Sequence, residues 1–467
     1  MNVPARRVDA AGRIHVDLQV IIALALPLVA NSAVQMVLNL TDVWFVGRLS
    51  TRALAAVSSV HWLAIAVVMV LSGIGIAVQT IAAQSYGAGR RARAAQSAWI
   101  ALWGVLLALP LFLGAGLGGL KLIARFGLPQ DIATMAGQFW LPRVAGSPFG
   151  AACWAMLGFF NGIGRPRITL LVTAVMALSN AFLNELFIFR LGFGVGGSGI
   201  ATTVAQALGL ALALGFFLGD DYRSRYRTHL TWRPHWNRLG QQFRLGLPMG
   251  LLWAADLIGM AIFQIMMVQL DAAAGAATQM VMVITAIAYM PGVGIALAGT
   301  TLVGQAIGAG DSAWAFRLGN RVVLMAAVYM GGVGLLLALS GPWLLPLFLN
   351  AQDAGAPPVL ALGLKILWLA AAYQFFDGIN LGSGFCLRGA ADAVVPAVAV
   401  LGASWLLFVP LAHMLIFAPG QGWLPLLPHL GYGALGGWTA VVVYVLTVAL
   451  ALLVRWRSRK WQRIHIQ

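Results

Sequence analysis

The chain has 467 residues, of which 61% are hydrophobic and only 9% are charged, and its formal net charge is +16. Soluble domains carry roughly 25% charged residues, so this composition excludes a soluble globular protein and indicates a membrane protein with many spans. The two cysteines, Cys153 and Cys386, lie far apart in apolar runs, which predicts neither a disulfide framework nor a cysteine metal site.

Twelve apolar stretches are long enough to cross a bilayer, which takes about 20 residues each. We therefore expect an all-α polytopic membrane protein with twelve transmembrane helices, whose first stretch is a full span rather than a cleavable signal. In chain order the predicted spans are 19–46, 53–80, 97–120, 139–160, 168–190, 199–218, 246–269, 276–303, 320–349, 361–387, 394–418 and 432–454.

Most of the 29 Lys and Arg residues fall on one side of the membrane when both termini are placed on that side. The positive-inside rule makes this side cytoplasmic, so we expect a multi-pass protein of the inner membrane with both termini in the cytoplasm. The positive charge is then a signal of topology, with anionic membrane lipid as a partner, and we expect no nucleic-acid partner. The opposite side holds Arg48, Arg52, Lys121, Arg125, Arg143, Arg190 and Lys365.

The sequence repeats itself with an offset of 221 residues. The stretch "LALPLVANS" at 24–32 recurs as "LGLPMGLLW" at 245–253, and "AAQSYGAGRRARA" at 82–94 recurs as "VGQAIGAGDSAWA" at 303–315. Each pair holds the same place in a unit of six spans. Because six is even, we expect two six-helix lobes with the same orientation, related by a pseudo-two-fold axis along the membrane normal, with a substrate path between them.

This repeat predicts three parts of the chain. The N-terminal lobe occupies 1–222, a cytoplasmic interlobe linker occupies 223–245, and the C-terminal lobe with a basic cytoplasmic tail occupies 246–467. The linker is polar and basic, and its tryptophans among arginines are typical of a segment that lies on a membrane surface.

Few of the 13 acidic residues fall within predicted spans. Asp42 lies in the first span, Asp256 in the seventh and Asp377 in the tenth. Acids within a membrane usually face a bundle interior or a wet cavity, and they mark routes for ions or protons. Asp42 is six residues from Arg48, so a plain ion pair is a strong alternative there. No Lys or Arg shares the seventh span or the body of the tenth, which weakens that alternative for Asp256 and Asp377.

Several stretches resemble the multidrug and toxic compound extrusion (MATE) family of cation-coupled efflux transporters. They are "LNLTDVWFVGRLSTRALAAVS", "AAQSYGAGR", "FFNGIGRPR", "SNAFLNELFIF", "RLGLPMG" and "YQFFDGINLGSGFCLRGAAD", spread over essentially the whole chain. The last is similar to the NorM-type branch. The resemblance implies a non-enzymatic antiporter that exports organic cations and drugs as Na+ or H+ enters, by alternating access. It implies no cofactor beyond the coupling ion, and we expect a monomer.

The resemblance also implies a cation site in the C-terminal lobe. Asp377 and Asp256 take the positions of its two carboxylates, as ligands for Na+, and Tyr373 adds an oxygen and an aromatic face one turn before Asp377. NorM-type members typically have Glu where this chain has Asp256, so this ligand is shorter by one methylene group. Met and aromatic side chains suit an adaptable drug cavity, although plain packing is the commoner role of Met at helical spacing. The candidates are Met260, Phe263, Met266, Met280, Met282 and Tyr289.

A second polar cluster is expected in the N-terminal lobe. Asp42 matches the family's first-span aspartate, and we expect it to be an auxiliary acid in coupling. Asn180 and Asn184 are four residues apart and share one helix face. Thr202 matches the position of the polar residue that completes this cluster in the family. Asn and Thr can also serve only as hydrogen-bonded contacts between helices, and this interpretation stays open.

Two prolines are expected to bend helices. Pro27 and Pro248 each remove a helix hydrogen bond, so they should kink the first and seventh spans and provide bending points for alternating access.

Two other functions are weighed. A lipid-linked precursor flippase of the same superfamily would need a basic central cavity, whereas the charges expected at membrane depth are acidic. An intramembrane protease is suggested by "GAGD" at 308–311, and by "GGSG" at 196–199 with His413 as a conceivable base. Asp311 is expected in a cytoplasmic loop and "GGSG" in a glycine-rich outer loop, and a catalytic dyad needs two carboxylates at one depth. Both observations argue against a protease.

Overall fold

The computed structural model describes residues 3–9, 12–125, 129–348, 356–423 and 427–464. Most of them lie in long apolar helices, which satisfy every backbone N–H and C=O within one segment, as a bilayer requires. The α-helices are α1 (Leu18–Leu49), α2 (Thr51–Gly87), α3 (Arg91–Ile123), α4 (Gln130–Ala145), α5 (Ser147–Gly162), α6 (Pro166–Asn184), α7 (Gly194–Leu218), α8 (Asp220–Tyr226), α9 (Trp236–Leu270), α10 (Ala272–Gly308), α11 (Ser312–Leu344), α12 (Ala356–Gly389), α13 (Val394–Gly402), α14 (Val409–Ile416) and α15 (Gly433–Arg457). Two π-helices, η1 (Glu185–Arg190) and η3 (Ala403–Phe408), and two 3-10 helices, η2 (Leu345–Phe348) and η4 (Lys460–Arg463), complete the helical elements of the described residues.

Eleven helical stretches in the described part of the chain are long and apolar enough to cross a membrane. They correspond to eleven of the twelve predicted spans, and the all-α polytopic fold is confirmed. The remaining prediction, 139–160, falls on α4 and α5, which have 16 residues each and are separated only by Gly146. Neither helix is long enough alone, but the two in succession have the length of a span.

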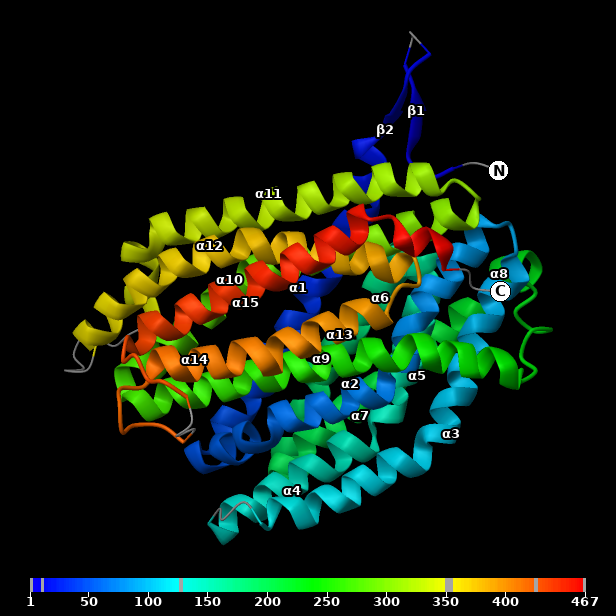
Figure 1. Cartoon of the computed structure of the whole chain (residues 1–467). Coiled ribbons are helices and arrows are strands. Elements are labelled where there is room, and N and C mark those ends of the chain that lie inside the picture. Colours follow the sequence, from blue (N-terminus) through cyan, green and yellow to red (C-terminus); the bar gives the residue numbers. More distant parts are fainter. Residues whose placement is uncertain (1–2, 10–11, 126–128, 349–355, 424–426, 465–467) are drawn as a thin grey trace.

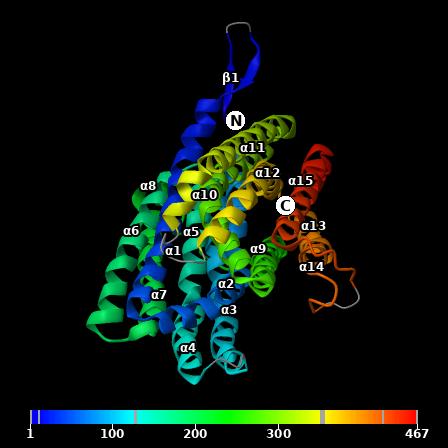
Figure 2. The ribbon, with the colours of Figure 1, turned by 90° about the vertical axis from the view of Figure 1, so that its left-hand side faces the viewer.

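The helix α8 and the stretch that follows α15 lie toward the same end of the long helices (Figure 1). We call this the basic end, because α8, the turn at 88–90 and the stretch after α15 carry arginines there. We use "first half" for α1–α7 with η1 and "second half" for α9–α15. In the turned view, α6 and α7 lie on one side of the molecule and α13–α15 on the other (Figure 2). Between them α2 packs against α9, and α1 packs against α10.

A short antiparallel hairpin precedes α1, and the sequence patterns did not predict it. Its strands are β1 (Arg6–Val8) and β2 (Ile14–Val16), and it projects from the helices in both views (Figures 1 and 2). The indole Nε1 of Trp314 donates a hydrogen bond to the carbonyl oxygen of Pro4 at 2.9 Å. The N-terminal segment is thereby fastened to the first turn of α11.

Two polar segments are more helical than predicted. The helix α9 already begins at Trp236, inside the segment expected as a linker at 223–245. The "GGSG" stretch at 196–199 lies within α7 rather than in an outer loop. In α9 the apolar residues that follow favour extending the helix, whereas in α7 the stretch is buried, with Gly197 and Gly199 packed closely against the backbones of η1 and α4.

Both predicted bending points lie inside helices that continue past them. Pro27 is in the third turn of α1 and Pro248 in the fourth turn of α9, and the chain on both sides of each proline stays helical. Each proline leaves one backbone carbonyl without its usual N–H partner. Their use as bending points during transport stays a prediction.

Candidate functional site

A cavity of about 380 Å³ lies among the helices of the second half. Asp256 from α9 and Asp377 from α12 both line it, and so does Tyr373, so the structure brings together the three residues predicted for the cation site. Among the described residues, Trp62 of α2 is the lining residue that the first half contributes. Much of the remaining lining is methionine and aromatic: Met249, Trp253, Met260, Met282, Tyr289, Met290, Phe385 and Tyr444.

The predicted drug-cavity side chains divide into two groups. Met260, Met282 and Tyr289 line the cavity. Met280 is not part of the lining, and Phe263 and Met266 are fully buried in the hydrophobic core of the second half. Helical spacing alone could not separate these groups, because neighbouring turns of one helix face both the core and the cavity.

Asp256 is held by a phenol from α15. The hydroxyl of Tyr444 donates a hydrogen bond to Asp256 Oδ1 at 2.9 Å. The Tyr444 ring is fixed in turn by Phe408, which stacks on it with 5.0 Å between ring centroids. The sequence patterns did not identify Tyr444, because nothing in its apolar span marks which face meets α9.

Asp377 accepts its hydrogen bond from the same helix. Asn380 Nδ2 donates to Asp377 Oδ1 at 3.0 Å, and the aspartate is only 7% exposed. The Tyr373 hydroxyl donates to Thr285 Oγ1 at 3.4 Å, and Gln374 Nε2 donates to the Thr285 carbonyl at 2.9 Å. These two bonds brace α12 against α10, so they fix the helix that carries the carboxylate.

Neither carboxylate forms an ion pair within the described part of the chain. One arginine does line the cavity. The guanidinium of Arg388 lies over the Phe385 ring, 4.3 Å from its centroid. Eleven residues separate Arg388 from Asp377, which corresponds to about 16 Å along a helix. The negative and positive charges therefore lie at different depths of the cavity.

The predicted cluster of the first half is also assembled. Asn184 Nδ2 donates to Asp42 Oδ1 at 2.7 Å and to Asn180 Oδ1 at 3.0 Å. Thr202 Oγ1 lies 3.3 Å from Asp42 Oδ2, within hydrogen-bond distance, and 3.4 Å from Asn180 Nδ2, which donates to it. Three helices, α1, α6 and α7, thus meet at one aspartate. The bonds alone fit both a role in coupling and a purely structural role.

The base near Asp42 differs from the one that sequence proximity suggested. Arg48 lies over the rings of Trp44 and Phe189, 5.0 Å and 5.9 Å from their centroids, and forms no ion pair with Asp42. Instead the charge of Arg143 in α4 acts on Asp42 without forming an ion pair with it, and the buried Nη1 of Arg143 has no hydrogen-bond partner among the described residues.

Two arginines also belong to helices near the acid sites: Arg143 lies in the last turn of α4 and Arg388 in the last turn of α12.

A π-helix adjoins each acid site. Asn184 ends α6, and η1 begins at the next residue. In the second half η3 ends at Phe408, the residue that stacks on Tyr444. The two π-helices occupy the same place in the repeated unit, the fifth and the eleventh span. Single-turn π-bulges inside α-helices are frequent at functional sites.

The two halves are hydrogen-bonded to each other at the basic end. Gln84 Nε2 donates to the Gly389 carbonyl, and Gln305 Nε2 donates to the Gly162 carbonyl, both at 2.9 Å. One turn earlier the threonines repeat the arrangement: Thr80 Oγ1 donates to the Arg388 carbonyl at 2.9 Å, and Thr301 Oγ1 to the Asn161 carbonyl at 3.0 Å. At this end α2 is therefore bonded to the end of α12, and α10 to the end of α5.

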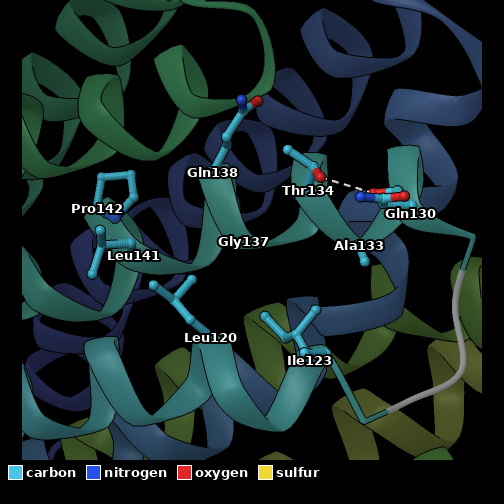
Figure 3. Close-up of a pocket in the computed structure, with 10 residues that line it drawn as sticks. Leu120, Ile123, Gln130, Ala133, Thr134, Gly137, Gln138, Leu141 and Pro142 are labelled. Carbon is cyan, nitrogen blue, oxygen red and sulfur yellow. Dashed lines mark hydrogen bonds between the residues drawn. The ribbon is translucent and has the colours of Figure 1, made fainter.

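A second hollow, between α3 and α4, has a different character (Figure 3). Its volume is about 510 Å³, and its lining includes Leu120, Ile123 and Leu141. Thr134 Oγ1 donates within its own helix to the Gln130 carbonyl at 2.8 Å. No charged side chain is part of its lining among the described residues.

The residues behind the protease alternative have other structural roles. Asp311 caps α11 by accepting a hydrogen bond from the Trp314 backbone N–H at 2.8 Å. Ser198 is buried within α7. His413 Nε2 accepts a hydrogen bond from the Trp423 backbone N–H at 3.1 Å, so this nitrogen is occupied by the loop after α14.

Known proteins resemble this chain over most of its length. A protein of Agrobacterium fabrum called "Probable multidrug resistance protein NorM" is 28% identical over 443 residues, which cover 93% of this chain and 92% of that protein. A Pseudomonas aeruginosa protein of the same name is 30% identical over 438 residues, 90% of this chain and 88% of that one.

Solved structures share the fold. "Crystal structure of MATE in complex with MaL6" has a TM-score of 0.82 and 19% identity, covering 94% of this chain and 95% of its own. A MOP superfamily transporter from Pyrococcus furiosus has a TM-score of 0.81 at the same identity and coverage. The family model MatE matches residues 27–186 and 248–414, once in each half and beginning at the two repeated prolines. The chain therefore belongs to the MatE family of multidrug efflux transporters.

Proposed function

We propose that this protein is an antiporter of the inner membrane that exports hydrophobic organic cations in exchange for Na+ or H+, with Na+ as the preferred ion. The observation that carries the proposal is one cavity in which two carboxylates, Asp256 and Asp377, share a wall with methionine and aromatic side chains. We assign no catalytic role to any residue and no cofactor besides the coupling ion.

The charge of the site supports exchange of cations. A carboxylate in a membrane interior costs several kcal/mol unless it is paired or protonated, and no base within the described residues pairs with either aspartate. Like charges in one cavity also repel, so an empty site favours binding a proton, a metal cation or a cationic substrate. Among the described residues each aspartate accepts one side-chain hydrogen bond, which leaves further lone pairs for a cation.

The apolar lining supports an organic substrate. Met260, Met282 and Tyr289 supply flexible thioether and aromatic surfaces, which adapt to ligands of different shape, and aromatic faces attract cations. The relatives named as multidrug resistance proteins fit this substrate class. The cavity combines two acids with one arginine, so it favours organic cations over the pyrophosphate of a lipid-linked precursor.

The closed basic end supports alternating access. If this end is cytoplasmic, as the positive-inside rule predicts, the hydrogen bonds of Gln84 and Gln305 close the cytoplasmic side in this conformation. The cavity would then exchange ions and drug with the outer side. Opening toward the cytoplasm requires that α2 and α10 lose these bonds.

Transport into and out of proteoliposomes tests the proposal. Purified protein is reconstituted, and efflux of a fluorescent organic cation is followed first with a Na+ gradient alone and then with a pH gradient alone. The proposal expects efflux with the Na+ gradient, and loss of that efflux in Asp377→Asn. Absence of dye movement under both gradients would overturn the antiporter assignment.

A further inference from the structure

A cavity at the basic end is lined almost wholly by arginines. Its volume is about 540 Å³, and it lies where the turn after α2, the end of α8 and the start of α9 come together. Among the described residues, no carboxylate forms an ion pair with Arg90, Arg225 or Arg238. The cationic lining consists of Arg90, Arg91, Arg93, Arg225, Arg227 and Arg238.

The start of α3 adds positive potential to this cavity. Arg90 precedes the first turn of α3, which has no side-chain cap. The partial positive charge at this helix N-terminus therefore lacks the acceptor that usually balances it. Several guanidinium groups beside an uncapped helix start are the donor set that binds a phosphate in proteins.

The turn after α10 in the second half is the repeat counterpart of the turn after α2, and there the charge is balanced. Gly89 and Gly310 make the same left-handed turn, with φ of +73° and +86°. After the second turn stands Asp311, which caps α11 and lies 3.9 Å from the guanidinium of Arg6 in the N-terminal hairpin. The second-half position is thus neutralised by the chain's own residues. At the first-half position Arg90 stands in place of the acid.

The cavity is held in place by two indoles. Trp99 Nε1 donates to the Thr228 carbonyl at 2.8 Å, and Trp103 Nε1 donates to the Trp232 carbonyl at 2.7 Å. They fasten the segment after α8 along α3. Tyr226, buried beside them, has its pKa raised to about 12 by burial, so the phenol stays neutral and adds no negative charge.

The segments next to the lining residues in the chain have the character of a membrane interface. Trp232 and Trp236 are 48% and 65% exposed, and Leu230 is 62% exposed. Further along α3, Leu106 and Leu107 are more than half exposed. Exposed tryptophans mark the headgroup level of a bilayer, and exposed leucines beyond them face acyl chains.

We propose that the six-arginine cavity binds the phosphate headgroup of an anionic phospholipid, whose acyl chains lie along the exposed leucines of α3. The arginines supply charge-assisted hydrogen bonds to phosphate oxygens, and the first turn of α3 supplies the helix potential. A soluble phosphate ester offers the same headgroup chemistry, but it would leave the exposed apolar side chains of these segments without a partner. This proposal is independent of the identity of the coupling ion and the drug.

Native mass spectrometry of the full-length protein in detergent tests the proposal. The probes are a phosphatidylglycerol, a diphosphatidylglycerol and a phosphatidylcholine of equal chain length, and inorganic phosphate as competitor. We expect both anionic lipids to bind at least tenfold more tightly than phosphatidylcholine, and millimolar phosphate to displace them only weakly. Equal binding of the three lipids, or complete displacement by phosphate, would overturn the lipid assignment.

A matched pair of triple variants locates the site. Replacing Arg90, Arg227 and Arg238 by Gln should weaken binding of the anionic lipids by roughly tenfold or more, since it removes three donors of charge-assisted hydrogen bonds to phosphate. Replacing Arg223, Arg233 and Arg244 by Gln removes the same charge from exposed positions outside the cavity lining. Equal losses in both triple variants would mean a general surface attraction and would contradict a site.

Discussion

Gln84 and Gln305 hold equivalent positions in the two halves, and each donates its side-chain amide to a backbone carbonyl of the opposite half at 2.9 Å. The backbone carbonyl groups of Gln84 and Gln305 also make equivalent contacts with the opposite half. A Cβ added at Gly87 would collide with the Gln305 carbonyl oxygen, and one at Gly308 with the Gln84 carbonyl oxygen. Two helices from different halves therefore touch backbone to backbone at the basic end, and only glycine permits this approach.

The first prediction concerns this contact. Gly308→Ala should disfavour the closed basic end, because the added methyl group meets a backbone atom that cannot move without separating α2 from α10. Backbone hydrogen exchange at 84–94 and 303–315 should become faster. Gly114→Ala is the control, since a Cβ there meets nothing within 4 Å. Unchanged exchange in Gly308→Ala would show that this contact does not hold the end closed.

The second prediction concerns the two cavity acids. Asp377→Asn and Asp256→Asn keep the side-chain shape but remove the charge, so each should abolish Na+-driven efflux while expression and folding stay near normal. Asp220→Asn, an exposed acid of α8, serves as the control. If both cavity variants retain the drug resistance and the Na+ dependence of the wild type, the assignment of the cation site is wrong.

The third prediction concerns the phenol that faces Asp256. Tyr444→Phe removes the hydrogen bond to the carboxylate and keeps the ring stacked on Phe408. A hydrogen bond to a charged group contributes about 1.5–3 kcal/mol, so without it the carboxylate gains more from a bound cation. Na+ should bind roughly tenfold more tightly, and turnover should slow because release is slower.

Isothermal titration with Na+ measures this affinity directly. Tyr329→Phe is the control, since no hydrogen bond of the Tyr329 hydroxyl is found among the described residues. Weaker Na+ binding in Tyr444→Phe would mean that the phenol oxygen is itself a ligand of the ion.

The fourth prediction concerns Asp42 and Arg143, the partly buried arginine whose charge acts on it. Asp42→Asn should lower the melting temperature, because it leaves the partly buried Arg143 without a compensating charge. Adding Arg143→Gln should recover part of the loss, and the coupling free energy of the double-mutant cycle should be about 0.5–3 kcal/mol. Additive effects of the two substitutions would show that the charges do not interact.

Transport by Asp42→Asn distinguishes a role of Asp42 in proton coupling from a purely structural role. If Asp42 is an auxiliary acid that carries protons, Asp42→Asn should impair dye efflux most when a pH gradient is the only driving force. An equal loss under Na+ and pH gradients would instead favour a role in holding α1, α6 and α7 together.

Much of the fold follows from the sequence because a bilayer leaves few alternatives. Apolar stretches of sufficient length must be helices there, and eleven of the twelve expected spans appear as such among the described residues. The meeting of Asp42, Asn184 and Thr202 was also predicted, since Asn180 and Asn184 share a helix face and the family resemblance supplied the rest.

What the sequence could not show depends on packing between helices. Arg143 is distant from Asp42 in the chain, and Arg48 is near, so proximity in sequence suggested the wrong neighbour. Tyr444 and Trp62 lie in apolar spans whose contact faces no pattern identifies. The N-terminal hairpin is too short to leave a strand signal, and its contact with Trp314 joins residues more than 300 positions apart.

The central claim is that one cavity binds both the coupling cation and the drug, so the two must compete. Cation entry then lowers the affinity for drug, and drug lowers the affinity for the cation by the same factor, with a coupling free energy on the order of 1–3 kcal/mol. The most direct measurement is the binding of fluorescent ethidium to purified protein at fixed pH, with K+ keeping the ionic strength constant as Na+ is added. Na+ should release the dye, and Asp377→Asn should blunt the release. If Na+ leaves the dye affinity unchanged and a lower pH reduces it, Na+ is not the coupling ion. If neither Na+ nor pH changes the dye affinity, the cation and the drug do not share one cavity.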